Sequence, residues 1–161
     1  MAAQLPPDLV AMMARGVSVI VASRDAALRP SLMRAVGSRV EADGRDITVY
    51  LSRPQSRQVV EDLASNGHIA VVFSEPSTHR TVQFKASRVE MRGAAEADAP
   101  VLARYLQSME NEIQQVGFAP PLTRAMLAHR LQDLVAVRFT PEQAFDQTPG
   151  PRAGAPLGSP R

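Results

Sequence analysis

The chain has 161 residues, a length that suits a single domain with a core of its own. Apolar residues make up 45% and charged residues 21%, as in ordinary globular proteins. Cysteine is absent, which excludes a disulfide framework, a cysteine-ligated metal centre and a thiol nucleophile. No apolar run is long enough for a membrane helix, and the first residues lack a secretory-signal pattern, so we expect a cytoplasmic protein without a membrane partner.

The formal net charge is only +2, but the charges are unevenly distributed along the chain. The stretch from Arg15 to Arg57 holds eight arginines against four acidic residues, whereas the stretch from Glu90 to Glu112 holds five acidic residues. The basic stretch favours an anionic ligand near the first half of the chain, although a solvated surface of mixed charges gives the same pattern. The small net charge and an aromatic content of 4% argue against a nucleic-acid surface.

The first half of the chain predicts four strands and two helices. Alternating apolar and β-branched residues indicate the strands, and Asp43-Gly44 is typical of a hairpin. Pro54 suits the first position of a helix, and Asn66-Gly67 suits its end. In chain order we expect a helix at 6–14, strands at 17–23, 30–41 and 46–52 that form a meander, a helix at 54–66 and a strand at 68–74.

The second half predicts a long strand, two helices and a last strand. In the strand expected at 79–92, Val82 and Phe84 have one parity and Val89 has the other, so a bulge or bend is expected near Ser87–Arg88. The remaining expected elements are helices at 97–116 and 122–130 and a strand at 133–139.

This order of elements predicts a mostly β fold with peripheral helices, built as a six-stranded, mostly antiparallel barrel. From Asp146 onward, four prolines and three glycines occur in 16 residues, a composition that cannot build a core of its own. We therefore divide the chain into a barrel domain at 1–145 and an irregular or extended C-terminal tail at 146–161.

Familiar catalytic signatures are absent from the sequence. There is no phosphate-binding loop, no GxGxxG and no GxSxG pattern. The three histidines stand too far apart for a metal-binding spacing, so no metal site is expected and no catalytic residue is assigned. An enzyme with such a sequence would rely on a cofactor for its chemistry.

Three segments place polar or basic residues where a ligand could use them. Arg34 interrupts an apolar strand face, which is costly unless the arginine meets an anion or an interface. Ser56 and Arg57 open a predicted helix, and a helix N-terminus suits a phosphate. Thr81 and Gln83 share the polar face of a strand. Each segment also has a structural interpretation, namely an exposed edge or salt bridge, a simple helix cap and a solvent-facing strand.

The order and spacing of these segments resemble the pyridoxamine 5′-phosphate oxidase-like family, the FMN-binding split β-barrels. The run from Arg29 to Arg34 is similar to the family's basic-x-x-x-x-basic strand, and Tyr50-Leu51 to its Tyr-Thr pair. Ser56-Arg57-Gln58 is similar to its Ser-Arg-Lys phosphate motif, and Arg80-Thr81-Val82 to its Arg-Gln-Val strand. The resemblance implies a six-stranded antiparallel split β-barrel over residues 1–145 and these cofactor contacts: Arg29, Pro30, Ser31, Leu32, Met33, Arg34, Tyr50, Leu51, Ser52, Ser56, Arg57, Gln58, Thr81 and Gln83.

The resemblance also implies an FMN-dependent oxidoreductase that acts on a small substrate as a homodimer, with the cofactor between the subunits. Ser56 and Arg57 would bind the phosphate, and Arg34 would lie near the pyrimidine edge of the flavin ring. Two residues depart from the family's pattern, because Gln58 stands for a lysine and Thr81 for a glutamine, and the loss of the lysine should weaken FMN binding. The chain also lacks an Arg-Leu-His substrate motif, so oxidation of vitamin B6 is not expected.

Two other classes of function stay open. One is a non-catalytic or stress-response protein that keeps the barrel and binds flavin, F420 or haem, and the departures at Gln58 and Thr81 favour it. Haem is less favoured, because no histidine follows His129. The other is a nucleic-acid-binding barrel, which the 17 arginines suggest and the small net charge opposes.

Overall fold

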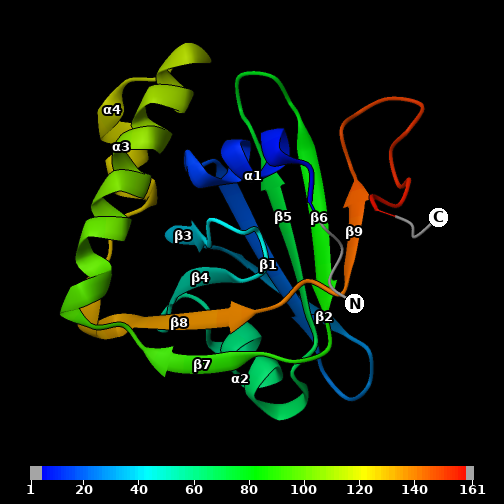
Figure 1. The fold of residues 1–161 in the computed structure, drawn as a ribbon. Helices are drawn as coiled ribbons and strands as arrows, with labels where there is room; N and C mark the ends of the chain where they lie inside the picture. Colours follow the sequence, from blue (N-terminus) through cyan, green and yellow to red (C-terminus); the bar gives the residue numbers. More distant parts are fainter. Residues whose placement is uncertain (1–4, 159–161) are drawn as a thin grey trace.

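The chain forms two antiparallel β-sheets around a shared core, with helices at the ends of the sheets and along one side (Figure 1). The computed structural model describes residues 5–158. The five-stranded sheet has the order β2-β1-β5-β6-β9, and the four-stranded sheet has the order β3-β4-β8-β7. The strands are β1 Ser18–Arg24, β2 Pro30–Arg34, β3 Gly37–Val40, β4 Ile47–Ser52, β5 Ile69–Ser74, β6 Thr81–Ala86, β7 Glu90–Gly93, β8 Leu134–Phe139 and β9 Gln143–Asp146.

The described residues contain nine strands, so the expected count of six is wrong. The strand expected at 30–41 is broken between β2 and β3, where the Ala35 N–H bonds Val19 in one sheet and the Val36 N–H bonds Tyr50 in the other. The strand expected at 79–92 is broken between β6 and β7, which confirms the predicted bend near Ser87–Arg88. Strand β9 is the ninth. Within residues 5–158 the strands pair as two separate sheets, so a closed six-stranded barrel is not formed.

The two faces of the five-stranded sheet differ in burial. Val21, Val71 and Phe84 point into the core and are fully buried, as alternation along a strand requires. Their neighbours Ile20 and Val72 lie on the opposite face and stay partly exposed. This outer face is therefore open to a ligand or to another chain.

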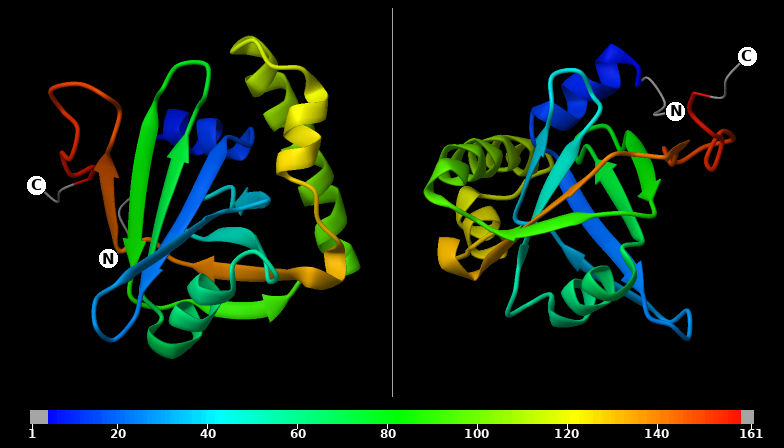
Figure 2. Two further views of the ribbon diagram at one scale, coloured as in Figure 1. Left: turned by 180° about the vertical axis from the view of Figure 1, so that it is seen from behind. Right: turned by 60° about the horizontal axis from the view of Figure 1, so that its bottom comes forward.

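Within residues 5–158, four α-helices flank the sheets: α1 Pro7–Ala14, α2 Arg57–Asn66, α3 Ala99–Gln115 and α4 Pro120–Met126. Helix α2 begins at Arg57 and not at Pro54, because residues 53–55 form a turn, and it ends as predicted at Gly67 in the left-handed conformation. Helix α3 packs on β3 and β4, so the four-stranded sheet is covered on both faces, whereas α2 packs on β1 and β2 (Figure 2). No helix within residues 5–158 is both long and apolar enough to cross a membrane.

The segment after β9 folds back along that strand. Asp146 donates its N–H to the carbonyl of Ala155 at 2.9 Å, and Leu157 donates to the carbonyl of Ala144 at 2.8 Å. Leu157 also packs against the core. The boundary expected between 145 and 146 falls inside β9, and residues 159–161 of the expected tail lie outside the described residues. The division into a barrel and a tail stays a prediction.

Candidate functional site

Strand β2 and helix α2 meet at a buried carboxylate. The Ser31 hydroxyl donates a hydrogen bond to Asp62 Oδ2 at 2.6 Å, and Gln58 Nε2 donates to Asp62 Oδ1 at 2.9 Å. Asp62 is only 4% exposed and takes part in no ion pair within residues 5–158. Ser31 and Gln58 were both predicted as cofactor contacts, so the fold brings these two residues together through Asp62.

The N-terminus of α2 lies next to this junction and holds two more predicted residues. Ser56 precedes the helix and is 2% exposed, yet its hydroxyl has no hydrogen-bond partner among the described residues. Arg57 and Gln58 follow in the first turn, where both side chains are exposed. The first N–H groups of a helix have no partner within it and attract anions. This end of α2 therefore combines the first N–H groups of the helix and the Ser56 hydroxyl with the exposed guanidinium group of Arg57.

Strand β2 is an edge strand whose outer side is unpaired. Met33 faces inward and packs against the core, whereas Pro30 and Leu32 are exposed. Arg29 lies in the turn before β2 and forms an ion pair with Asp25 at 2.7 Å, and both partners are reached by solvent. The predicted segment is thus accessible along the unpaired edge of β2, but the guanidinium group of Arg29 is already paired with Asp25.

The outer face of the five-stranded sheet brings Arg34, Thr81 and Gln83 onto one open surface. Arg34 pairs with Ile20 on β1, Ile20 with Val72 on β5, and Val72 with Gln83 on β6, so these four residues form one row across the sheet. Arg34 Nη1 donates to the hydroxyl of Ser18 at 2.7 Å, one position further along this face.

The last three residues of β4, namely Tyr50, Leu51 and Ser52, are all buried. Tyr50 is 1% exposed and lies beneath α3, whereas Leu51 points to the main core and is fully buried. The Tyr50 hydroxyl donates to Asp98 Oδ1 at 2.8 Å, and burial, reinforced by this carboxylate, raises the pKa of Tyr50 to about 12. The cofactor role of these residues stays a prediction, and their buried side chains leave the backbone as the accessible part.

The segment that follows β9 holds β6 in place. Thr148 Oγ1 accepts the N–H of Thr81 at 3.0 Å, and the N–H of Gln147 donates to the Thr81 carbonyl at 2.9 Å. Gln147 Nε2 also reaches Gln83 Oε1 at 3.4 Å. Both predicted residues of β6 are therefore positioned by a part of the chain that the sequence assigned to an irregular or extended tail.

Comparison of the sequence with family profiles and with curated proteins finds no match. Solved structures do match. A pyridoxamine 5′-phosphate oxidase-related, FMN-binding protein from Nostoc punctiforme superposes with a TM-score of 0.52 at 10% identity, over 92% of this chain and 87% of that one. The chain has the fold of the pyridoxamine 5′-phosphate oxidase-like proteins. The resemblance read from the sequence is thus confirmed at the level of the fold.

Two further neighbours of this pyridoxamine 5′-phosphate oxidase-like fold are named for other cofactors. An F420 reductase matches with a TM-score of 0.57 at 12% identity, over 87% of this chain and 98% of that one. The haem storage protein HutZ from Vibrio cholerae matches with a TM-score of 0.52 at 18% identity, over 89% and 94%. The fold alone therefore leaves open whether this chain binds any of these three cofactors.

Sequence reasoning missed three residues that organise the candidate site within this fold. Asp62 was not singled out, although its spacing of four residues from Gln58 suits a contact on one helix face. The sequence around Ser18 and Thr148 does not mark them as site residues. Pairing of β1 with β2 brings Ser18 to Arg34, and the segment that folds back after β9 brings Thr148 to Thr81.

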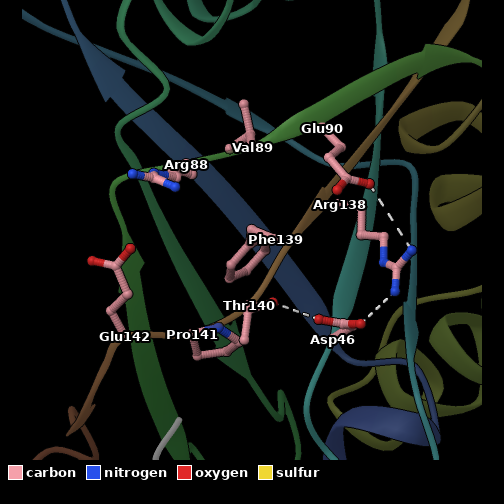
Figure 3. Close-up of a pocket in the computed structure, with 9 residues that line it drawn as sticks. All are labelled: Asp46, Arg88, Val89, Glu90, Arg138, Phe139, Thr140, Pro141 and Glu142. Atoms are coloured by element: carbon pink, nitrogen blue, oxygen red, sulfur yellow. Dashed lines mark hydrogen bonds and ion pairs between the residues drawn. The ribbon is translucent and has the colours of Figure 1, made fainter. Parts of the chain in front are cut away.

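A cleft of about 570 Å³ lies between the bend after β6 and the end of β8 (Figure 3). Its charges are largely paired with one another: Arg138 forms ion pairs with Asp46 and Glu90, and the Thr140 hydroxyl donates to Asp46 Oδ1 at 2.6 Å. None of the predicted site residues lines this cleft. The residues that line the cleft include three carboxylates against two arginines, so the cleft is a poor anion site.

Proposed function

We propose that this chain binds FMN and uses it, as a homodimer, in an oxidoreductase reaction on a small substrate. One observation carries the cofactor assignment. Ser56 precedes a ten-residue helix, beside the exposed Arg57, and its buried hydroxyl has no hydrogen-bond partner in the described part of the chain. A phosphate accepts hydrogen bonds from hydroxyl, guanidinium and helix N–H groups together, so this donor set fits the phosphate of FMN.

The other predicted residues fit the rest of the molecule. The unpaired edge of β2 offers backbone groups and the exposed Leu32 to the ribityl chain and ring. Arg34 offers a cation on the open face, where negative charge on the ring would be stabilised. When bound, FMN supplies the acceptor for a hydride, and the chain contributes positioning and exclusion of water.

A second copy of the chain is the proposed cover for this site. Leu28 and Leu32 are 68% and 62% exposed, and they lie in or next to the β1–β2 hairpin. Leu28 also adopts a positive φ of 63°, which is unfavourable for a leucine. Covering these side chains would bury apolar surface and remove water from the β2 edge.

A titration with two flavins tests the proposal. FMN and riboflavin differ in the phosphate, so FMN should quench in fluorescence with a Kd at least tenfold lower than that of riboflavin. Equal affinities would show that no phosphate site exists. Faster oxidation of NADH or NADPH by the FMN-loaded protein than by free FMN would support the enzymatic part of the proposal.

A non-catalytic or stress-response protein that binds F420 or haem is the second candidate. The residue that stands in the place of the related family's lysine favours it, because Gln58 is neutral and donates to the buried carboxylate of Asp62 beside the phosphate donors. Tight binding of F420 or haem together with weak FMN binding would select this candidate. Turnover by a protein that carries no FMN, F420 or haem would exclude both candidates.

A further inference from the structure

A second cavity, of about 620 Å³, lies on the outer face of the five-stranded sheet. Its floor includes Ala22 on β1 and Ala70 on β5, which pair directly with each other. Because both side chains are single methyl groups, the sheet is hollowed at this point. We call this cavity the alanine hollow, and its volume lies within the range of small-molecule sites.

Basic side chains stand on both sides of the alanine hollow. Lys85 on β6 pairs with Ala70 and closes the hollow toward β9. Arg24 ends β1 and His68 comes just before β5, so these two residues line the opposite end. Strands β1 and β6 and the residue before β5 thus contribute one basic residue each around a small apolar floor.

The cations of the alanine hollow are not neutralised by carboxylates. Within residues 5–158, Arg24 donates only to the backbone carbonyl of Asp25, and Lys85 Nζ lies 5.3 Å from the centre of the Phe145 ring. Among the described lining residues Glu142 alone is acidic, and its Oε1 accepts hydrogen bonds from the N–H and hydroxyl of Ser87. The cleft of Figure 3 differs, because there Arg138 is paired with acidic residues.

We infer that the alanine hollow binds the carboxylate or phosphate group of a small molecule. Arg24 and Lys85 supply charge, and His68 supplies a further ring nitrogen for hydrogen bonding. The apolar floor takes the body of the molecule. This binding site is separate from the N-terminus of α2, so it does not depend on the FMN assignment.

The position of the hollow also indicates a substrate class, and this step rests on the proposed function. The row of Ala22, Ala70 and Lys85 is the next row on the same face after that of Arg34 and Gln83. Such rows are about 7 Å apart along a strand. A small anion held in the hollow would therefore extend its other end toward the proposed cofactor face, which is the arrangement a substrate needs.

A nuclear magnetic resonance titration of the intact protein without flavin tests the site. We expect inorganic phosphate or benzoate to give saturable shifts at the amides of Ala22, Ala70 and Lys85, and the probe that binds identifies the anion class. The variants Lys85→Gln and Arg24→Gln should each weaken binding at least fivefold. Arg104→Gln, which changes an exposed arginine on α3, is the matched control and should leave the affinity unchanged.

A size variant separates the hollow from a general effect of charge. Ala22→Leu keeps both cations but fills the floor from the partly exposed face, so it should abolish binding without loss of the folded core. Absence of saturable shifts in the wild type, or equal affinity in all variants, would overturn the inference. Binding of phosphate or benzoate by a protein that fails to bind FMN would keep the hollow and reject the proposed function.

Discussion

The Asp98 cluster and the Asp62 junction are each built around a carboxylate that is 4% exposed, but their surroundings differ. Asp98 accepts hydrogen bonds from the Tyr50 hydroxyl, from both terminal nitrogens of Arg92 and from the N–H of Ala95. Among residues 5–158, Asp62 accepts hydrogen bonds from two neutral donors only, and the nearby Ser56 hydroxyl has no hydrogen-bond partner.

This difference separates a structural cluster from a candidate binding site. Every polar group around Asp98 has a partner, so the cluster fixes the start of α3 against β4 and has little left to offer a ligand. The region around Asp62 keeps unused donors at a helix N-terminus and next to an open strand edge. Burial alone does not distinguish Asp98 from Asp62, because both are 4% exposed. The two regions differ in whether their buried polar groups have hydrogen-bond partners.

The largest expected effect is on stability at the Asp98 cluster. Asp98→Asn should lower the free energy of unfolding at neutral pH by about 2–3 kcal/mol, because the charge-assisted bonds from Arg92 are lost and the buried Tyr50 hydroxyl loses its acceptor charge. Chemical unfolding followed by circular dichroism measures the change. An equal loss in Asp62→Asn would contradict the contrast between the two carboxylates.

The same cluster predicts a dependence on pH with a defined sign. Hydrogen bonds from Arg92 hold the pKa of Asp98 well below its usual value of 3.8. A lowered pKa means that the stabilisation is present above the unfolded-state pKa and is lost as the pH falls below it. The stability gap between wild type and Asp98→Asn should thus be constant above about pH 5 and narrow below pH 4. A gap that widens in acid would refute this assignment.

The next effect tests the helix N-terminus as the anion site. Arg57→Ala should raise the Kd for FMN by about 10- to 100-fold, as expected for the loss of a charged hydrogen bond. The affinity for riboflavin, which has no phosphate, should change little. Arg104→Ala serves as the control, and an unchanged FMN affinity in Arg57→Ala would rule out the phosphate assignment.

A smaller effect is expected from the return segment that holds β6. Thr148→Val keeps the shape of the side chain but removes the oxygen that accepts the Thr81 N–H, at a cost of about 1 kcal/mol. Hydrogen exchange at the Thr81 amide should become faster, and FMN affinity should fall by about fivefold if Thr81 contacts the cofactor. Faster exchange with unchanged affinity would remove Thr81 from the site.

The smallest effect concerns the charge of Asp62. Asp62→Asn removes a negative charge beside the proposed phosphate while it keeps an acceptor for Ser31 or Gln58. FMN affinity should rise by about two- to fivefold at low salt, and the gain should shrink as salt screens the charges. Weaker binding in this variant would mean that Asp62 positions the donors and does not repel the ligand.

A break in a strand is predictable from the sequence where the apolar residues change parity, and it is hidden where they keep the same parity. The bend near Ser87–Arg88 is predictable because the apolar residues change parity there. The corner between β2 and β3 is hidden because Leu32, Val36 and Val40 keep one parity while the chain passes from one sheet to the other. Strand β9 is short and adjoins a Pro/Gly-rich stretch, so only its pairing with β6 reveals it.

The candidate site divides in the same way. Ser56 and Arg57 are predictable because local sequence marks a helix start, and the structure places both at the N-terminus of α2. The surroundings of Gln58 are not predictable, since Asp62 also depends on Ser31, which is 31 positions away in the chain. The alanine hollow escaped notice because alanine carries no local signal for a site, and only sheet register brings Ala22 and Ala70 together.

The absorption spectrum of the purified protein, with the mass of any compound released by heat, decides whether this chain is a flavoprotein. We expect a flavin spectrum with FMN released or, if the cofactor is lost in purification, quenching of added FMN with a Kd in the micromolar range or below. A colourless protein that leaves FMN fluorescence unchanged would contradict it. A spectrum of haem or F420 would also contradict it and select the second candidate.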